Sequence, residues 1–380
     1  MIVLIKKNHY IGIEVKATTY IVVVALVIVS QCFALDDSAQ DTIKDDDRSA
    51  FEYFPFVLYD TDIGFGGGAK FFLFNQFGDQ ESLDLLLFAS TKGERWVRIV
   101  SSLPDIGSRQ GTNFGWAFNL IFDYDLMIKY NFYGIGSESK YDDHEYYSME
   151  PIDIKAVFSR SISDELSFSM TLRHLIVRNY NFGKNSILRN LEPNLNDGVA
   201  RASSYIIKGI WDQRDNYLHP TNGHLIEASL EHCPDLSTSN VSYLKLSLSA
   251  MKYFYWDIIS SVIALRLMTE NIDGLNLPVQ MMIPLGGNRT LRGFPQARFI
   301  GKSIVIGNAE LRFPIWWKFQ GILGLDAGRV AESYGKIGFQ NWTFSPAFGL
   351  RFFYDNFIIR LDTGFSDEYF GLYFNINHIF

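Results

Sequence analysis

The 380-residue sequence has little cysteine, little positive charge and few long apolar runs. Two cysteines are too few for a disulfide scaffold. The formal net charge of −8 lacks the basic excess of nucleic-acid binders, so we expect no nucleic-acid partner. Beyond residue 35, no apolar run reaches the roughly 18 residues that a membrane-spanning helix needs. These absences exclude three broad classes of protein before any motif is considered.

Aromatic residues, in contrast, are abundant. They make up 16% of the chain, whereas charged residues make up only 20%. Intrinsically disordered chains show the opposite balance, with few aromatic and many charged residues. The 30 glycines against 11 prolines suit many strands joined by turns. The composition therefore favours an all-β protein.

The first 34 residues have the layout of a secretory signal peptide. Three lysines accompany an apolar run at 21–29, and Ala34 offers a small residue for cleavage. The apolar run is too short for a membrane anchor. A lipoprotein signal ending at Cys32 is the other interpretation, although glutamine just before the cysteine fits it poorly. We expect residues 1–34 to direct export and to be removed.

Residues 35–50 form an acidic segment that contains six aspartates and few apolar residues. Such a composition predicts a disordered, solvated tail. The segment is also too short to fold as a domain of its own. The remaining chain, residues 51–380, is expected to form one domain.

From about residue 51 onward, apolar and polar residues alternate with a period of two. In 166–173, for example, one face is wholly apolar and the other wholly polar, and 244–249 repeats this pattern. A soluble β-sandwich would alternate in the same way. Charged residues in the middle of the polar faces, and runs longer than the ~5–6 residues of ordinary strands, favour a transmembrane barrel with a wet lumen.

The alternation marks about fifteen candidate strands. Single-chain bacterial barrels have even strand counts, so either 51–59 or 125–135 is expected to hold a sixteenth strand. Long connections are expected at 124–148, 179–200 and 270–300. In barrels of this type, long loops face outward and short turns face the periplasm.

Three segments carry a family resemblance. They are 286–294, with the sequence Gly-Gly-Asn-Arg-Thr-Leu-Arg-Gly-Phe, then 212–223, and the terminal strand that ends in Phe380. In this order and spacing, they resemble the BamA/TamA superfamily of outer-membrane proteins, the bacterial surface antigen family. The resemblance covers about residues 55–380. It implies an all-β fold, a transmembrane antiparallel β-barrel of sixteen strands with a loop that folds back into the lumen.

The resemblance also implies how that loop is held. Its lumen motif consists of Leu291, Arg292, Gly293 and Phe294. Arg292 matches the arginine that meets acidic wall residues in the family, and Glu310 and Asp326 match those acids. A guanidinium offers a planar fork to carboxylates, and both acids lie opposite in phase to apolar neighbours, so they face the lumen. From the residues alone, an arginine exposed to water and two solvated acids remain an equal alternative.

The segment 212–223 is interpreted as the end of one strand, a turn and the start of the next. Its motif residues are Asp212, Arg214, Asp215, Pro220 and Gly223. An ordinary periplasmic hairpin is the simplest interpretation.

In the family, the first and last strands form a weak seam. The resemblance places this seam between 63–75 and 370–380. The first of these segments contains Gly64, Gly66, Gly67 and Gly68, and glycines weaken a strand. A glycine-rich turn or bulge is the alternative interpretation.

The end of the chain resembles the signal by which the outer-membrane assembly machinery recognises barrels. Its residues are Leu372, Phe374, Ile376 and Phe380. His378 departs from that pattern. This signal implies that the assembly machinery is a partner during biogenesis.

The resemblance implies insertion or translocation of polypeptides at the outer membrane. Partners would be membrane lipid and, beyond it, periplasmic proteins or client polypeptides. A passive or gated channel is the alternative function. An enzyme is the third, because neither a Gly-x-Ser-x-Gly nor a His-Glu-x-x-His motif is present, and we assign no catalytic residues, metal site or cofactor. Residues 35–54 leave no room for the periplasmic domains of the best-known members, so a barrel alone is expected.

Overall fold

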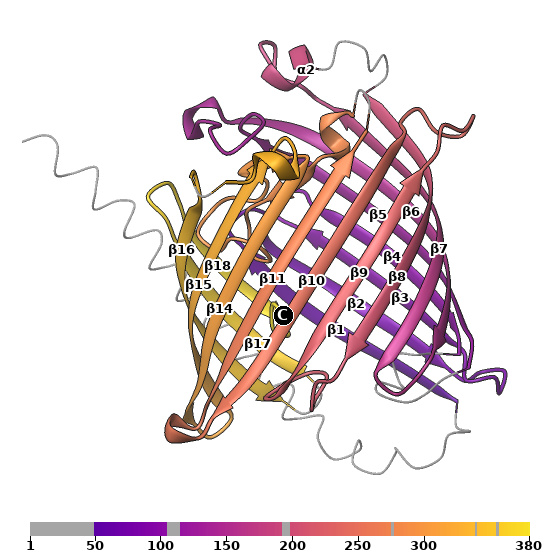
Figure 1. Ribbon diagram of the computed structural model, residues 1–380. Coiled ribbons are helices and arrows are strands. Elements are labelled where there is room, and N and C mark those ends of the chain that lie inside the picture. The colour runs from indigo at the N-terminus through magenta and orange to yellow at the C-terminus, as the bar shows by residue number, and fades with distance from the viewer. Residues whose placement is uncertain (1–48, 105–114, 192–197, 275–276, 339, 355–356) are drawn as a thin grey trace, which may run out of the picture. The chain divides into compact units, whose positions relative to one another are not determined.

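The computed structural model describes residues 49–104, 115–191, 198–274, 277–338, 340–354 and 357–380. The predicted signal peptide and nearly all of the acidic tail lie outside these residues. Sixteen antiparallel strands close into one barrel. Figure 1 shows the barrel from the side. The predicted all-β barrel of sixteen strands is therefore confirmed.

Each barrel strand pairs with its neighbours in the sequence, apart from one insertion and the closure. The first eight are β1 (Ala50–Asp60), β2 (Gly64–Phe74), β3 (Ser82–Ser90), β4 (Arg95–Leu103), β5 (Ala117–Phe132), β6 (Glu145–Ser161), β7 (Leu166–Tyr180) and β8 (Val199–Asp212). The second eight are β9 (Gly223–Cys233), β10 (Tyr243–Trp256), β11 (Ser261–Asp273), β14 (Ser303–Trp316), β15 (Phe319–Ala331), β16 (Thr343–Tyr354), β17 (Phe357–Phe365) and β18 (Phe370–Ile376).

The insertion lies between β11 and β14, which pair directly with each other. It contains a separate two-stranded sheet, β12 (Ile283–Leu285) and β13 (Phe299–Gly301). Helical segments among the described residues are short: α2 (Ile187–Leu191) and single turns at Tyr141–Asp143, Asp257–Ile259, Val279–Met281 and Tyr334–Lys336. Within the described part of the chain, no helix combines the length and apolar character needed to cross a membrane.

The two ends of the barrel differ. We call the end where β1 begins and β18 finishes the terminal end, and the opposite one the loop end. The terminal end has short connections, such as 162–165 and 317–318, whereas the loop end carries the insertion between β11 and β14. The stretch 124–148, expected to be a long connection, is mostly strand, since β5 runs to Phe132 and β6 begins at Glu145.

The period-two pattern sets which side chains face inward. On β10, Leu244, Leu246 and Leu248 are exposed on the outer surface, while Lys245 faces the lumen and pairs with Glu270 of β11 at 2.7 Å. Similar exposed apolar side chains cover the outside of the other strands. Soluble monomers rarely expose an apolar surface this extensive, so the surface indicates contact with a membrane.

The sixteenth strand is β1, so the 51–59 interpretation is confirmed and 125–135 belongs largely to β5. The alternation in β1 is hard to detect because aromatic residues occur on both of its faces. Phe51 and Tyr53 are exposed, whereas Phe56 stacks in parallel on Phe88 of β3 with ring centroids 6.1 Å apart. A strand that is apolar on both sides gives no period-two signal.

The barrel closes between β1 and β18. In the described residues this seam has two paired positions, Tyr59 with Phe374 and Asp60 with Tyr373, against eleven between β1 and β2. The expectation that 63–75 forms the seam is wrong, because that segment is β2, one strand away from it. Of the two seam strands, β1 is the one that the alternation did not predict.

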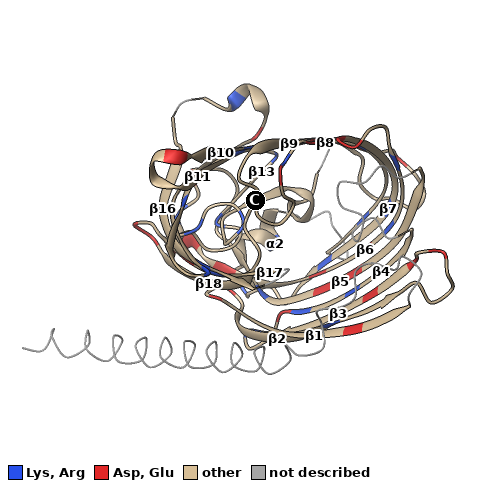
Figure 2. Ribbon diagram, turned by 90° about the horizontal axis from the view of Figure 1, so that it is seen from below, with Lys and Arg blue, Asp and Glu red and all other residues tan. Residues whose placement is uncertain are grey.

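The lumen has two unlike halves, and Figure 2 looks along it. The insertion lies in the half bounded by β11 and β14 to β18, and the buried apolar cluster around it also includes residues of β7 to β10. Charged side chains line the half formed by β2 to β10, at positions that remain partly exposed.

Candidate functional site

The insertion turns back into the lumen at three glycines. Gly286, Gly287 and Gly293 have φ angles of 128°, 84° and 91°, which favour glycine over residues with side chains. A Cβ atom on Gly293 would lie 2.4 Å from the backbone nitrogen of Phe365, so the loop touches β17 where only glycine fits. Leu291 and Phe294 are buried in the apolar cluster. The loop is therefore packed as tightly as a protein core.

Arg292 lies at the centre of a buried charge cluster. Its Nε and Nη2 atoms each donate a hydrogen bond of 2.9 Å to the carboxylate of Asp326. Its Nη1 donates to Glu310 at 2.8 Å, and its backbone N–H donates to Asp326 at 3.0 Å. All three side chains are fully buried. The structure thus brings together the three residues that the family resemblance paired.

A third acid, Asp362 of β17, belongs to the same cluster. It accepts a hydrogen bond from Arg292 Nη1 at 3.3 Å and is held by both guanidinium nitrogens of Arg351. Arg360 lies 3.6 Å from its other side. Sequence reasoning missed Asp362 and Arg351. The inward phase of both residues was readable, but which strands meet the loop depends on the barrel's closure.

Arginines outnumber acids in this cluster. Glu310, Asp326 and Asp362 are the three acids, and Arg266, Arg292, Arg312, Arg351 and Arg360 are the five arginines; all eight side chains are largely buried. Main-chain oxygens accept some of the hydrogen bonds that the additional arginines donate. Arg312 donates to the main-chain oxygen of Phe380 at 2.7 Å, and Arg266 donates to that of Arg289 at 2.6 Å. The cluster therefore ties the loop and the chain end to the same wall.

The loop also contacts both sides of the seam. On the β1 side, the amide of Asn288 donates to Asp60, and the backbone N–H of Gln296 donates to Asp62 at 2.9 Å. On the β18 side, the hydroxyl of Ser366 donates to the carbonyl of Gly293 at 2.6 Å. The short seam is thus bridged by side-chain and backbone bonds from inside the barrel.

At the loop end, Arg298 joins three connections. Its guanidinium donates to both carboxylate oxygens of Glu368 at 2.6 and 2.7 Å and to the hydroxyl of Ser139 at 3.0 Å. It also lies 4.9 Å from the ring centroid of Tyr133. The connections β5–β6 and β17–β18 are thereby fastened to the insertion.

The other half of the lumen carries a belt of ion pairs across β2 to β11. The pairs include Lys70–Asp84, Arg98–Asp123, Lys155–Asp153, Arg173–Glu231 and Lys245–Glu270. Several of these side chains are partly exposed, and such pairs contribute only about 0–1 kcal/mol each. The exposed pairs therefore form a hydrated polar wall, whereas Arg173, Asp153 and Glu231 make a largely buried group within it.

The segment 212–223 is the β8–β9 connection at the terminal end. Arg214 donates to both oxygens of Asp212, at 2.9 and 2.6 Å, and Asp215 accepts from the backbone N–H of Thr221 at 2.8 Å. Pro220 is buried within the turn, and Gly223 has a φ of 101°. The motif residues therefore shape a tight turn.

This turn also reaches the end of the chain. His219 lies 3.2 Å from His378 between ring nitrogens and edge-on to Phe353 of β16. Burial, together with the positive charge of Arg312, lowers the pKa of His219 to about 4. Burial and the same arginine also hold the pKa of His378 well below its usual range. Both rings are therefore neutral near pH 7.

The terminal residues do not form one continuous face. Leu372, Phe374 and Ile376 lie on the outward side of β18, opposite the buried Tyr373. Asn377 has a φ of 65° and ends the strand, so Phe380 turns into the lumen. There it packs against three residues of β10 and β11: Tyr253, Val262 and Ala264.

The glycines Gly64, Gly66, Gly67 and Gly68 all lie in β2. Two of them make room for aromatic rings in the lumen. A Cβ atom on Gly66 would lie 2.2 Å from the ring of Phe88, and one on Gly68 would lie 2.6 Å from that of Phe56. Phe88 stacks in turn on Trp96 at 4.1 Å. These glycines thus serve ring packing beside the seam.

No constellation for chemistry emerges in the part of the chain that the structure describes. There, no three His, Cys, Asp or Glu residues are arranged to hold a metal ion. Cys233 is buried and unpaired. The histidines with strongly shifted pKa values, His219 and His378, stack on each other and on an aromatic ring.

The closed sixteen-stranded barrel, with an arginine-bearing loop buried in its lumen, defines the class of the protein as a membrane-spanning β-barrel. Residues 76–380 match the model of the Omp85 superfamily domain, which covers most of the chain. The chain belongs to the Omp85 superfamily. This confirms the resemblance found from the sequence motifs. Comparison with curated proteins finds no match.

Solved structures show the same fold. BamA from Haemophilus ducreyi lacking POTRA domains 1–3 superposes with a TM-score of 0.65 at 13% identity, over 87% of this chain and 70% of that one. CdiB from Acinetobacter baumannii gives a TM-score of 0.55 at 17% identity, and CdiB from Escherichia coli gives 0.59 at 12%. Each covers 86% of this chain, which spans 59% and 62% of those chains respectively.

Proposed function

We propose that this protein is an outer-membrane barrel that inserts or translocates polypeptides through sideways opening between β1 and β18. The observation that carries the proposal is the seam, with two paired positions against eleven in the adjacent β1–β2 pair. Each unpaired backbone group in a membrane must find another partner. A client strand that pairs with the free part of β1 would supply those partners.

The proposed placement follows the alternation and the ends of the barrel. The apolar outer surface faces lipid, the terminal end faces the periplasm, and the loop end faces outward. Residues 1–34 would direct export and then be removed. The assembly machinery would recognise the terminal strand during biogenesis, and periplasmic proteins or clients would approach the terminal end.

In this proposal, the Arg292 cluster and the charged belt have different roles. The cluster around Arg292 fixes the loop against β14, β15 and β17. The charged belt on the opposite wall offers a hydrated surface to a polar chain. No cofactor or nucleotide enters the mechanism, since strand pairing and lipid contact supply its free energy.

A disulfide across the seam tests the proposal. Tyr59→Cys with Phe374→Cys places two thiols at directly paired positions, where Cβ atoms in antiparallel strands lie about 4.5–5.5 Å apart. We expect oxidation to stop insertion of a reporter barrel into vesicles and reduction to restore it. Leu361→Cys with Phe374→Cys is the matched control, because it locks β17 to β18 and leaves the seam free. Equal activity of the oxidised and reduced seam variant would refute sideways opening.

A gated channel is the second candidate, favoured by the charged belt along the open half of the lumen. Planar-bilayer conductance separates the two functions. The insertion function predicts little steady conductance in the intact barrel. The channel function predicts steady conductance whose ion selectivity changes with charge reversal at Lys155.

A further inference from the structure

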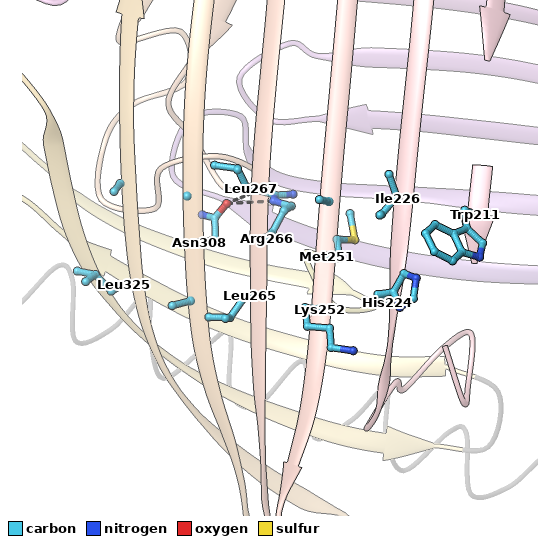
Figure 3. Close-up of a pocket in the computed structure, with 14 residues that line it drawn as sticks. Trp211, His224, Ile226, Met251, Lys252, Leu265, Arg266, Leu267, Asn308 and Leu325 are labelled. Carbon is cyan, nitrogen blue, oxygen red and sulfur yellow. Dashed lines mark hydrogen bonds between the residues drawn. The ribbon is translucent and has the colours of Figure 1, made fainter. Parts of the chain in front are cut away.

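The outer wall carries a groove that the proposed function does not use. It has a volume of about 730 Å³ and lies across β8 to β11, β14 and β15. Figure 3 shows Trp211 and His224 at one end, Leu325 at the other and Lys252 between them. Its outward-facing lining is almost wholly apolar.

The groove follows the register of the sheet. Its lining residues occupy two adjacent rows that run from strand to strand. One row is Trp211, Ile226, Ala250, Leu267, Gly307 and Ala327, and the next is His224, Lys252, Leu265, Ala309 and Leu325. Gly307, Ala309 and Ala327 are short where neighbouring positions carry leucine, which makes the wall concave. Six strands at about 4.8 Å spacing give a length of roughly 24 Å.

The groove opens to the membrane and not to the lumen. Leu265, Leu267 and Leu325 are exposed on the outer surface. Arg266 and Asn308 also border the groove, but their side chains bond to each other and to the lumen loop. Their backbone therefore lies beneath the groove.

Lys252 places a charge inside the groove, on β10, the third of its six strands. Among the described residues it forms no ion pair with a carboxylate, although it lies on a face that is otherwise apolar from Leu244 to Ala250. A cation on the lipid face of a barrel is unfavourable near the bilayer centre and tolerable near the headgroups. Its Nζ lies 5.3 Å from the ring centroid of Phe254, two residues closer to the terminal end. The ammonium thus points toward the aromatic residues that finish β10.

We propose that this groove binds a phospholipid of the periplasm-facing leaflet, with one acyl chain along the small residues and the phosphodiester at Lys252. From Lys252 the groove crosses β11 and β14 to Leu325 on β15, three strand spacings or roughly 14 Å, which is close to the ~15 Å depth of one leaflet of the hydrocarbon core. The phosphate supplies the counter-charge that the protein does not give Lys252. The inference rests on the proposed membrane placement of the barrel.

Native mass spectrometry of the detergent-purified barrel with added phosphatidylglycerol tests this site. The wild type should retain one phospholipid after the detergent is removed. Gly307→Leu with Ala309→Leu fills the groove and should weaken phosphatidylglycerol binding about tenfold, the equivalent of losing roughly two buried methylenes. Lys252→Gln should weaken it at least severalfold. Lys318→Gln is the matched control, a lysine that packs over Trp317 at the same end of the barrel, and should bind as the wild type does.

Heat-modifiable gel migration shows that each variant is folded, and membrane fractionation tests the placement separately. If the double variant does not fold, Lys252→Gln against Lys318→Gln decides alone. Equal lipid retention in all variants would overturn the proposal and leave only annular lipid. A dimer that the leucine substitutions dissolve would overturn it too, because a second copy would then occupy the groove.

Discussion

Arg292 and Asp326, 34 residues apart in the sequence, are joined by two parallel hydrogen bonds of 2.9 Å and by a third from the backbone of Arg292. This fork fixes both the position and the rotation of the guanidinium. It is completely shielded from water. The pair therefore anchors the loop to β15.

Arg292→Ala should destabilise the folded barrel by about 3–5 kcal/mol, because it leaves the buried carboxylate of Asp326 without its arginine. Arg292→Lys should restore little, since an ammonium cannot form the fork. The loss can be measured as a lower midpoint temperature of heat-modifiable gel migration and as lower membrane levels. Arg289→Ala, an exposed arginine of the same loop, is the control. An unchanged midpoint in Arg292→Ala would remove the structural role assigned to this pair.

Asp362→Asn should be about as damaging, at roughly 3–5 kcal/mol, although no sequence motif marks this residue. The substitution keeps the shape but leaves Arg360 without its acid and Arg351 with Glu310 alone, 3.7 Å away. Unfolding in urea, followed by tryptophan fluorescence, measures the difference. Asp367→Asn in the neighbouring turn should behave like the wild type. If both variants unfold at the same urea concentration, the third acid is dispensable.

Gly66→Ala should destabilise the barrel by about 1–3 kcal/mol, because its Cβ would overlap the ring of Phe88. Gly67→Ala is a close control: it lies in the same strand, and its Cβ would have no neighbour closer than 3.9 Å. The same urea titration applies. Equal loss in both variants would mean that strand propensity matters here and ring packing does not.

The contact between the β8–β9 turn and the chain end should weaken in acid. The pKa of His219 is about 4 in the folded protein and about 6.5 when exposed, so the released state binds more protons between these values. Stability is unaffected above about pH 6.5 and falls as the pH drops from there toward 4. The midpoint of heat-modifiable migration should therefore decrease between pH 7.5 and pH 5. His219→Phe, which keeps the packing on Phe353, should show a smaller decrease. Identical decreases would assign the effect to other groups.

Much of the barrel could be predicted from the sequence, because apolar and polar residues alternate regularly along a strand with one lipid-facing side. The inward phase of Glu310 and Asp326 could be read directly, and the family resemblance paired them with Arg292. The partners that escaped notice depend on closure of the barrel. Asp362 lies 70 residues from Arg292, and only the register of the last strands brings it to the loop.

Two further features were hidden for local reasons. β1 is aromatic on both faces, which removed its period-two signal and shifted the expected seam to β2. The turn of Phe380 into the lumen depends on one left-handed residue, Asn377. Asparagine tolerates that conformation, but an asparagine in a sequence does not predict it. The contact of His219 with His378 follows from this turn and could not be predicted from the sequence either.

The bonds that the loop makes to Asp62 on one side and through Ser366 on the other have a mechanical consequence. Two paired positions and the Thr61–Leu372 hydrogen bonds hold β1 and β18 together directly. The loop bonds to the connections on both sides of this seam, so the seam and the loop must move together when the barrel opens. A substitution at Gly293 can therefore alter the free energy of opening without changing either strand.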